Sequence, residues 1–184
     1  MSPAIVESIR AGLVFSLQQA VGTDNIGARE ADLAARATAH FSRCPNLELL
    51  GNPAAARLPI FSLRFRHGQH DLHHGFVVAL LNDLFGIQVR GGCSCAGPYA
   101  HALLGIDMRK SRLLEQAIAD GHSLMRPGWV RVNFNYFISE DEFAYLLAAI
   151  ELVAQHGWRM LPSYHYDAAH GVWRRHDAYR LSNT

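Results

Sequence analysis

Residues 85–98 read FGIQVRGGCSCAGP, and this stretch decides the fold. Its apolar first part, residues 85–89, is typical of a helix end that turns into a short strand. The strand then runs into two glycines, which let the backbone take positive φ and come close to a ligand. Cys93 and Cys95 follow beside Arg90, whose positive charge favours the reactive thiolate form. Two interpretations stay open: a loop that holds a reactive thiol at the mouth of a cleft, or a tight turn with incidental cysteines.

The composition is that of a soluble globular protein. The chain has 184 residues, of which 49% are hydrophobic and 18% charged, so it is long enough for a core of its own. Its formal net charge of +1 gives no electrostatic case for nucleic acid or an anionic membrane. Three cysteines are too few for a disulfide framework, no signal peptide opens the chain, and no apolar run could span a bilayer. We therefore expect a reduced, cytoplasmic protein with neither a nucleic-acid nor a membrane partner.

Two helices are predicted at the start of the chain. Large apolar residues recur every four positions from Ile5 to Leu17, and Gly22 ends that pattern. An alanine-rich second helix covers residues 25–42, because Pro45 stops it.

Strands then alternate with helices. A short strand at 47–50 is followed by residues 60–66, where Phe61, Leu63 and Phe65 share one face of a half-buried strand. Residues 72–84 have helical spacing, and residues 87–90 form a third strand that leads into the cysteines.

The second half continues the alternation. Helices are predicted at 99–104 and 108–120, and a strand at 129–136 places Arg131 opposite its apolar face. Ser139 and Glu142 form a capping box that opens an amphipathic helix. The aromatic tail, residues 157–184, suggests a hairpin around 169–171. This order of elements predicts an α/β (α+β-like) fold with a mainly antiparallel sheet covered by helices, in a single small domain over residues 1–184.

The cysteine stretch resembles a motif of known enzymes. Cysteine desulfurases carry Gly-Ile-x-Val-Arg-x-Gly-His-His-Cys-Ala-x-Pro, and residues 86–92 match its first half while residues 95–98 match its second. With the Arg131 strand and the Ser139 helix, this segment resembles the C-terminal small domain of class V aminotransferase-like, pyridoxal-phosphate-dependent enzymes, closest to cysteine desulfurases and selenocysteine lyases. The likeness runs from about residue 3 to residue 156. Cys93 and Ser94 replace the paired histidines, and the interval from Cys95 to Arg131 is longer than in a plain desulfurase.

The resemblance implies roles for three residues. Cys95 takes the place of the catalytic cysteine, whose thiolate attacks the sulfur of a cysteine-like amino acid and leaves a persulfide and alanine. Arg131 takes the place of the arginine that binds the substrate α-carboxylate. Arg90 adds positive charge to the substrate site and raises the thiolate fraction of Cys95. On this reading all three open onto the same side of the domain.

The resemblance also implies a cofactor that this sequence does not anchor. Such enzymes hold pyridoxal phosphate through a lysine Schiff base in a large domain N-terminal to the part matched here. Lys110 is the only lysine, and it lies in a polar helical segment typical of a solvated residue. We therefore expect no cofactor-binding residue in this chain and pyridoxal phosphate only in the parent enzyme.

Several single residues have simpler interpretations. Arg131 alone would also fit a surface charge on an exposed strand face. The four histidines at 67, 70, 73 and 74 straddle the join of a strand and a helix, which favours loop residues or a helix start over a metal site. We therefore predict no metal ligands. Cys44, beside Pro45 at a helix end, is expected to be a buried, inert thiol.

The expected partners follow from the same reading. The parent enzyme would take an amino-acid substrate and form a homodimer, and residues 1–22 would be a leading helix at the junction with a missing large domain. Alternatives are a class V aminotransferase-like protein with structural cysteines, or a free-standing domain that binds a partner protein.

Overall fold

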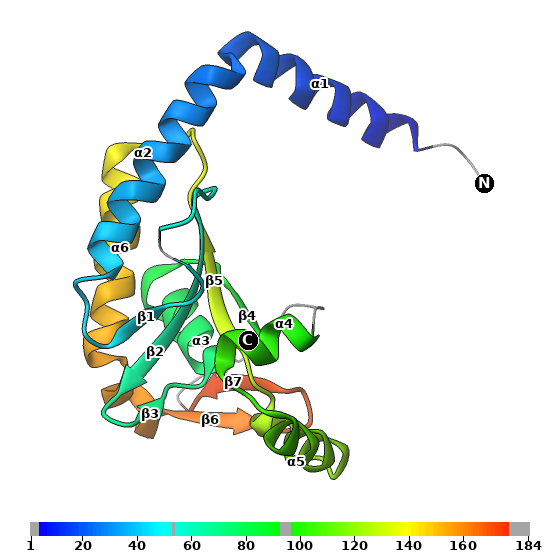
Figure 1. The fold of residues 1–184 in the computed structure, drawn as a ribbon, viewed down its shortest axis with the longest axis vertical. Helices are drawn as coiled ribbons and strands as arrows, with labels where there is room; N and C mark the ends of the chain where they lie inside the picture. The colour runs from blue at the N-terminus through cyan, green and yellow to red at the C-terminus, as the bar shows by residue number, and fades with distance from the viewer. Residues whose placement is uncertain (1–3, 53, 93–96, 177–184) are drawn as a thin grey trace, which may run out of the picture.

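An antiparallel sheet organises the molecule. The computed structural model describes residues 4–52, 54–92 and 97–176. The sheet has the order β1-β2-β5-β4, with β3 paired to the far end of β2 (Figure 1). The strands are β1 (Leu47–Leu49), β2 (Ile60–His67), β3 (His70–Asp71), β4 (Arg90–Gly92) and β5 (Trp129–Asn133).

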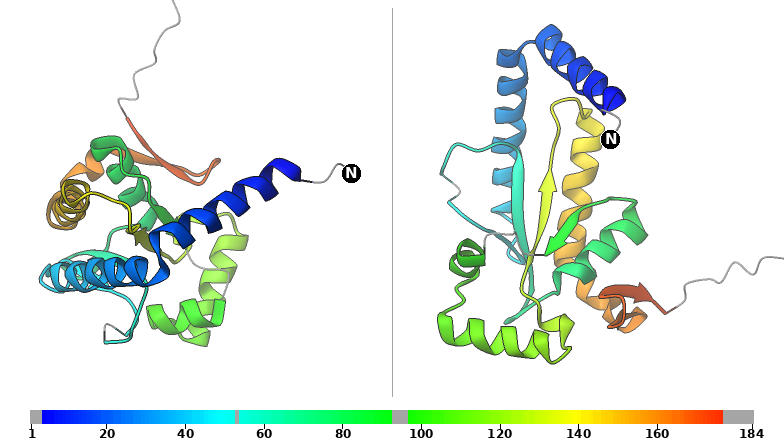
Figure 2. Two further views of the ribbon diagram at one scale, coloured as in Figure 1. Left: turned by 90° about the horizontal axis from the view of Figure 1, so that it is seen from above. Right: turned by 90° about the vertical axis from the view of Figure 1, so that its right-hand side faces the viewer.

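Helices cover both faces of this sheet, although unequally. The helices are α1 (Ile5–Val21), α2 (Thr23–Phe41), α3 (His74–Phe85), α4 (Gly97–Leu104), α5 (Met108–Ala119) and α6 (Glu140–His156). Helices α2, α3 and α6 supply most of the helical residues of the main core on one face. On the other face, α4 lies across the sheet from α3 and α6 (Figure 2). Its residue Ala100 joins Leu50 and Trp129 in a small second cluster.

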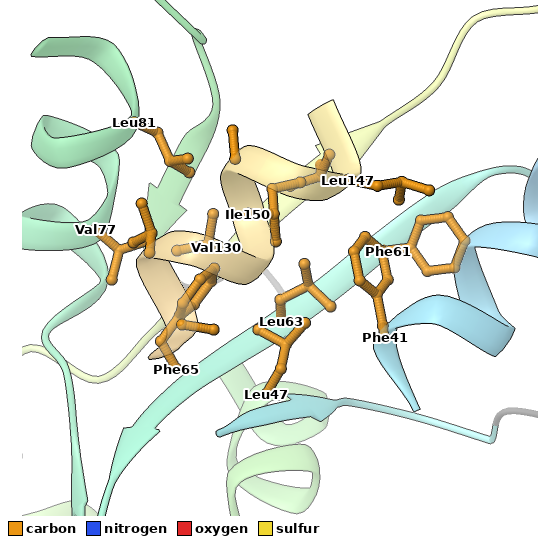
Figure 3. Packing of buried hydrophobic residues seen from close by; sticks show 14 of the residues in the cluster. Phe41, Leu47, Phe61, Leu63, Phe65, Val77, Leu81, Val130, Leu147 and Ile150 are labelled. Atoms are coloured by element: carbon orange, nitrogen blue, oxygen red, sulfur yellow. The ribbon is translucent and has the colours of Figure 1, made fainter. Parts of the chain in front are cut away.

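The alternation of β2 and β5 builds the main core. Phe61, Leu63 and Phe65 are fully buried and meet side chains of α2 and α6 (Figure 3). The ring of Phe61 lies 5.4 Å from that of Phe41 in an edge-to-face arrangement, a favourable geometry for aromatic pairs. Successive residues of a strand point to opposite faces of the sheet. Val130 and Val132 point into the main core, so Arg131, which lies between them, points to the opposite face.

A charged network ties α2 to the start of α6. Arg29 and Arg36 each lie 2.6 Å from a carboxylate oxygen of Glu140, and this pairing lowers the pKa of Glu140 to about 2. Ser139 and Glu142 form the predicted capping box, which satisfies two free N–H groups at the start of α6. The sequence signal for this helix start is therefore confirmed.

The sequence predicted four of the five strands of the sheet and missed the short β3. The segments at 60–66, 87–90 and 129–136 do share one sheet, and the α/β fold class with an antiparallel sheet is confirmed. The third strand, however, begins only at Arg90, because the Ile87 N–H donates to the Leu81 carbonyl instead of a neighbouring strand. The strand predicted at 129–136 ends at Asn133.

The tail forms the expected hairpin. After the 3-10 helices η1 (Ser123–Met125) and η2 (Gly157–Ser163), β6 (Tyr164–Asp167) pairs with β7 (Val172–Arg175). Trp173 of β7 packs on Phe76 of α3, with ring centroids 5.1 Å apart. This contact holds the hairpin against the outside of α3.

Helix α1 stands apart from the rest of the molecule. It projects from the end of α2 (Figure 1), and none of its residues is buried. Its exposed large side chains are Ile5, Val6, Ile9, Leu13, Val14, Phe15, Leu17 and Val21. No helix in the described part of the chain has the length and apolar character needed to cross a bilayer.

Candidate active site

Two arginines face each other across the edge of the sheet. Arg90 of β4 and Arg131 of β5 are direct partners in the antiparallel register, so their side chains leave the same side of the sheet. Both residues are exposed, and within the described ranges neither guanidinium has an ion-pair partner. Two like charges placed opposite each other are unfavourable, and an anion bound between them relieves that repulsion.

The two arginines line one pocket of about 550 Å³, called here the arginine pocket. Its walls are the segment after α3, the end of β5 and the first turns of α6. The Tyr145 hydroxyl donates to the Phe85 carbonyl at 2.9 Å and fastens two of these walls together. Glu142 is the one carboxylate among the described lining residues, and its oxygen is taken by the N–H and hydroxyl of Ser139. The pocket is therefore positively charged and suited to a carboxylate ligand.

The glycines before the cysteines have a structural reason. A Cβ on Gly91 would stand 2.9 Å from Val78 Cγ2, so only glycine lets β4 approach α3 this closely. Gly92 has φ of +123°, a conformation that residues with a side chain rarely adopt. The candidate catalytic residue Cys95 and its neighbour Cys93 lie outside the described residues, between the end of β4 and the start of α4.

The structure thus brings together two of the three residues that the sequence singled out. Arg90 and Arg131 open onto the same side, as expected. The roles assigned to Arg90, Arg131 and Cys95 stay predictions. Cys44 is buried, as predicted, and its burial raises the pKa of the thiol, which makes it a poor nucleophile.

The four clustered histidines take separate structural places. His67 stacks on Trp158 at 4.2 Å, and His70 lies on the short strand β3. His73 is the N-cap of α3, and His74 begins that helix. The described residues contain no group of three or more His, Cys, Asp or Glu side chains placed to hold one metal ion. The helix-start interpretation is confirmed for His73 and His74.

His73 is held in its neutral form. Its Nδ1 accepts hydrogen bonds from the Gly75 N–H and the Trp173 Nε1–H, both at 3.0 Å. Its Nε2 is buried beside the Leu124 backbone and forms no hydrogen bond of good geometry with a described residue. Burial, and then the charge of His74, lowers the pKa of His73 to about 4. Sequence reasoning missed this arrangement, because Trp173 comes from the distant hairpin.

We expect this histidine to make stability depend on pH. Between pH 6.5 and 4 the unfolded chain protonates His73 while the folded chain does not, so the free energy of unfolding falls as pH drops through this range. A His73→Asn variant keeps an acceptor for both donors but does not titrate. Urea unfolding at several pH values should show a weaker pH dependence for this variant than for the wild type. An unchanged slope would contradict the neutral assignment.

Lys110 does not fit the role of a cofactor anchor. It lies exposed near the start of α5, where its backbone N–H donates to Asp107 in a helix cap. A Schiff-base lysine needs a desolvated or cationic site that lowers its pKa. Asp71, the carboxylate that shares a shallow pocket with Lys110, is already paired with Arg64 at 2.9 Å. The residues of this chain therefore do not fit a covalent site for pyridoxal phosphate, although they fit a carboxylate site.

Comparison with known proteins places the chain in a family. A search of curated proteins gave no match. A family model described as Aminotransferase class-V matches residues 2–156, which is most of the chain and includes the sheet, both arginines and the cysteine stretch. Enzymes of this family generally depend on pyridoxal phosphate. The resemblance found in the sequence is confirmed at the level of the family, and the chain belongs to the class V aminotransferases.

Proposed function

We propose that this chain is the carboxylate-binding domain of a pyridoxal-phosphate-dependent enzyme of the cysteine desulfurase or selenocysteine lyase type. The observation that carries the proposal is the cross-strand pair of Arg90 and Arg131 in a positively charged pocket. An arginine fork binds a carboxylate with two parallel hydrogen bonds, which fixes the orientation of an amino-acid substrate. The substrate class is therefore an α-amino acid, held by its carboxylate at Arg131.

In this proposal Cys95 is the sulfur acceptor. Its thiolate attacks the sulfur of cysteine and the substrate C–S bond breaks, with the bonding electron pair passing to the β-carbon. This carbon takes up a proton to give alanine, and the sulfur stays on Cys95 as a persulfide. The short distance along the sequence from β4 to Cys95 supports this role. Only four residues, the first two of them glycines, separate Cys95 from Arg90. If a Cys95→Ser variant of the complete enzyme still released sulfur from cysteine, the class V aminotransferase reading with structural cysteines would replace this one.

The proposal also needs a lysine from outside this sequence. Because Lys110 is unsuited, the cofactor would be anchored in a large domain that meets this one, with α1 at the junction. The exposed apolar side chains of α1, none of which is buried, support such a contact. The same observation favours the second candidate, a free-standing domain that binds a partner protein through α1.

Ligand binding by the chain itself tests the carboxylate site. Cysteine added to ¹⁵N-labelled protein should shift the resonances of β4 and β5 saturably, while cysteamine, which lacks the carboxylate, should not. An Arg131→Met variant should bind cysteine about tenfold more weakly, because a charge-assisted bidentate contact is lost.

Arg109→Met is the matched control. Arg109 is exposed on α5, away from the arginine pocket, so its replacement removes the same charge without touching the site. Equal cysteine binding by the Arg131 and Arg109 variants, or equal binding of cysteine and cysteamine, would refute the carboxylate role of Arg131.

A further inference from the structure

A second pocket lies between the C-terminal hairpin and the edge of the sheet. It measures about 550 Å³ and is called here the hairpin pocket. Its walls come from the start of α3, the end of β4, the segment around η1 and the turn of the β6–β7 hairpin. Residues 164–175 of the hairpin lie beyond the part of the chain that the family model matches. The hairpin therefore completes a pocket that the matched part of the chain does not form alone.

The charges around the hairpin pocket are positive. Arg126 lines it, and in the described part of the chain this guanidinium has no carboxylate partner. No described lining residue is acidic. The nearest hairpin carboxylate, Asp167, is already held by Arg174 at 3.0 Å and by His170 at 2.7 Å, which lowers its pKa to about 2. Because Asp167 is neutralised by its own partners, the charge of Arg126 stays available to a ligand.

Hydrogen-bond donors gather at the same place. The hydroxyls of Ser123 and Tyr166 form a hydrogen bond of 2.8 Å in the lining of the pocket. Because only one of the two hydroxyls donates in this bond, the other can donate its O–H to a ligand. The turn places His170 at the rim. The first turn of α3 adds the positive end of a helix dipole, which favours an anion nearby.

The side chain of His74 holds the backbone at Arg126 in place. His74 Nε2 lies 3.3 Å from the Arg126 carbonyl, and its ring fills the space beside Gly91 and Gly128. Burial lowers the pKa of His74, and the Arg126 charge lowers it further, whereas the hydrogen bond to the Arg126 backbone acts in the opposite direction. His74 is therefore a positioning residue for the segment that carries Arg126.

We propose that the hairpin pocket binds a small oxyanion, with Arg126 as the charged anchor and the Ser123–Tyr166 hydroxyl pair as the second contact. The shared chemistry is a carboxylate or phosphate group with several acceptor oxygens, which suits a pocket rich in donors and free of acidic lining residues. This site differs from the arginine pocket, since no described residue lines both.

Titration of the chain with inorganic phosphate and, separately, with acetate tests the proposal and distinguishes the two sources. Saturable shifts in ¹H–¹⁵N spectra should centre on residues 123–126 and 166–171 for at least one of the two anions. An Arg126→Gln variant should weaken that binding about tenfold or more, Arg126→Lys should weaken it less, and Tyr166→Phe should have an intermediate effect.

Two controls keep the outcome clear. Arg126 is exposed and its backbone carbonyl is retained in the glutamine variant, so circular dichroism and the melting temperature should match the wild type. Arg131→Met should bind the anion at the hairpin pocket as well as the wild type does, whatever happens to cysteine binding. The proposal is wrong if neither anion binds, if Arg126→Gln binds like the wild type, or if the shifts are confined to β4 and β5 around Arg90 and Arg131.

Discussion

A Gly128→Ala variant is expected to lose about 3 kcal/mol or more of its free energy of unfolding. A Cβ at this position would stand 2.7 Å from both the Cα and the carbonyl carbon of Gly92, and 2.6 Å from His74 Cδ2. The Gly92 atoms are backbone of β4 and cannot rotate away, as the end of a flexible side chain could. The added methyl group must therefore push β4 off its register with Trp129. Urea unfolding measures the loss as a lower midpoint.

Gly27→Ala is the matched control for this substitution. Gly27 lies inside α2, and a Cβ there meets nothing within 4 Å. Alanine should raise the free energy of unfolding by about 0.5–1 kcal/mol, since it has the higher helix propensity. The two variants add the same methyl group, so opposite signs isolate the packing at Gly128. If Gly128→Ala were as stable as the wild type, β4 could not lie this close to the segment before β5.

The parts of the fold that sequence reasoning predicted are those with a local pattern. The alternation of Phe61, Leu63 and Phe65 is visible along eight residues, and it places the same side chains in the core of the structure. The capping box at Ser139 is likewise contained in four residues. Both signals depend on neighbours in the chain, so no knowledge of the tertiary structure is needed to read them.

The edge strand was harder, because apolar residues do not distinguish a strand from a buried loop. Residues 87–89 were predicted as strand, but Ile87 is buried while its N–H donates to Leu81, after Gly86 ends α3 in the left-handed conformation. The N–H of Ile87 takes part in the C-cap of α3 and so is not available for hydrogen bonding to a neighbouring strand. The pairing with β5 therefore starts at Arg90. This competition between cap and ladder is not encoded in hydrophobicity.

The two candidate sites also differ in how far the sequence could predict them. The resemblance predicted that Arg90 and Arg131 open onto the same side of the domain, whereas their direct pairing in the register is seen only in the structure. The hairpin pocket could not be predicted. Its lining joins His73 to Tyr166, which is 93 positions later in the numbering, through the packing of Trp173 on Phe76. Nothing in either segment alone indicates the other, and single arginines such as Arg126 are usually surface charges.

The isolated chain is expected to self-associate through α1. Eight large apolar side chains of this helix are exposed, whereas soluble monomers rarely leave contiguous apolar patches above a few hundred Å² open to water. Ile5, Ile9, Leu13 and Leu17 recur every four residues along one side, which is the spacing of a helix face. The helix carries one acidic and one basic residue, Glu7 and Arg10, so two copies do not repel each other. We therefore expect a dimer in which the α1 helices of two copies pack together.

Light scattering of matched variants measures this association. Leu13→Glu places a charge in the centre of the apolar face and should give a monomer at concentrations where the wild type is a dimer. Gln18→Glu adds the same charge about 140° around the helix from Leu13, away from the centre of this face, and should stay dimeric. Since neither residue is buried in the chain, both variants should unfold at the wild-type temperature. A wild-type chain that stays monomeric at high concentration, or a Gln18→Glu variant that dissociates as fully as Leu13→Glu, would show that the exposed face of α1 does not pair with a second copy.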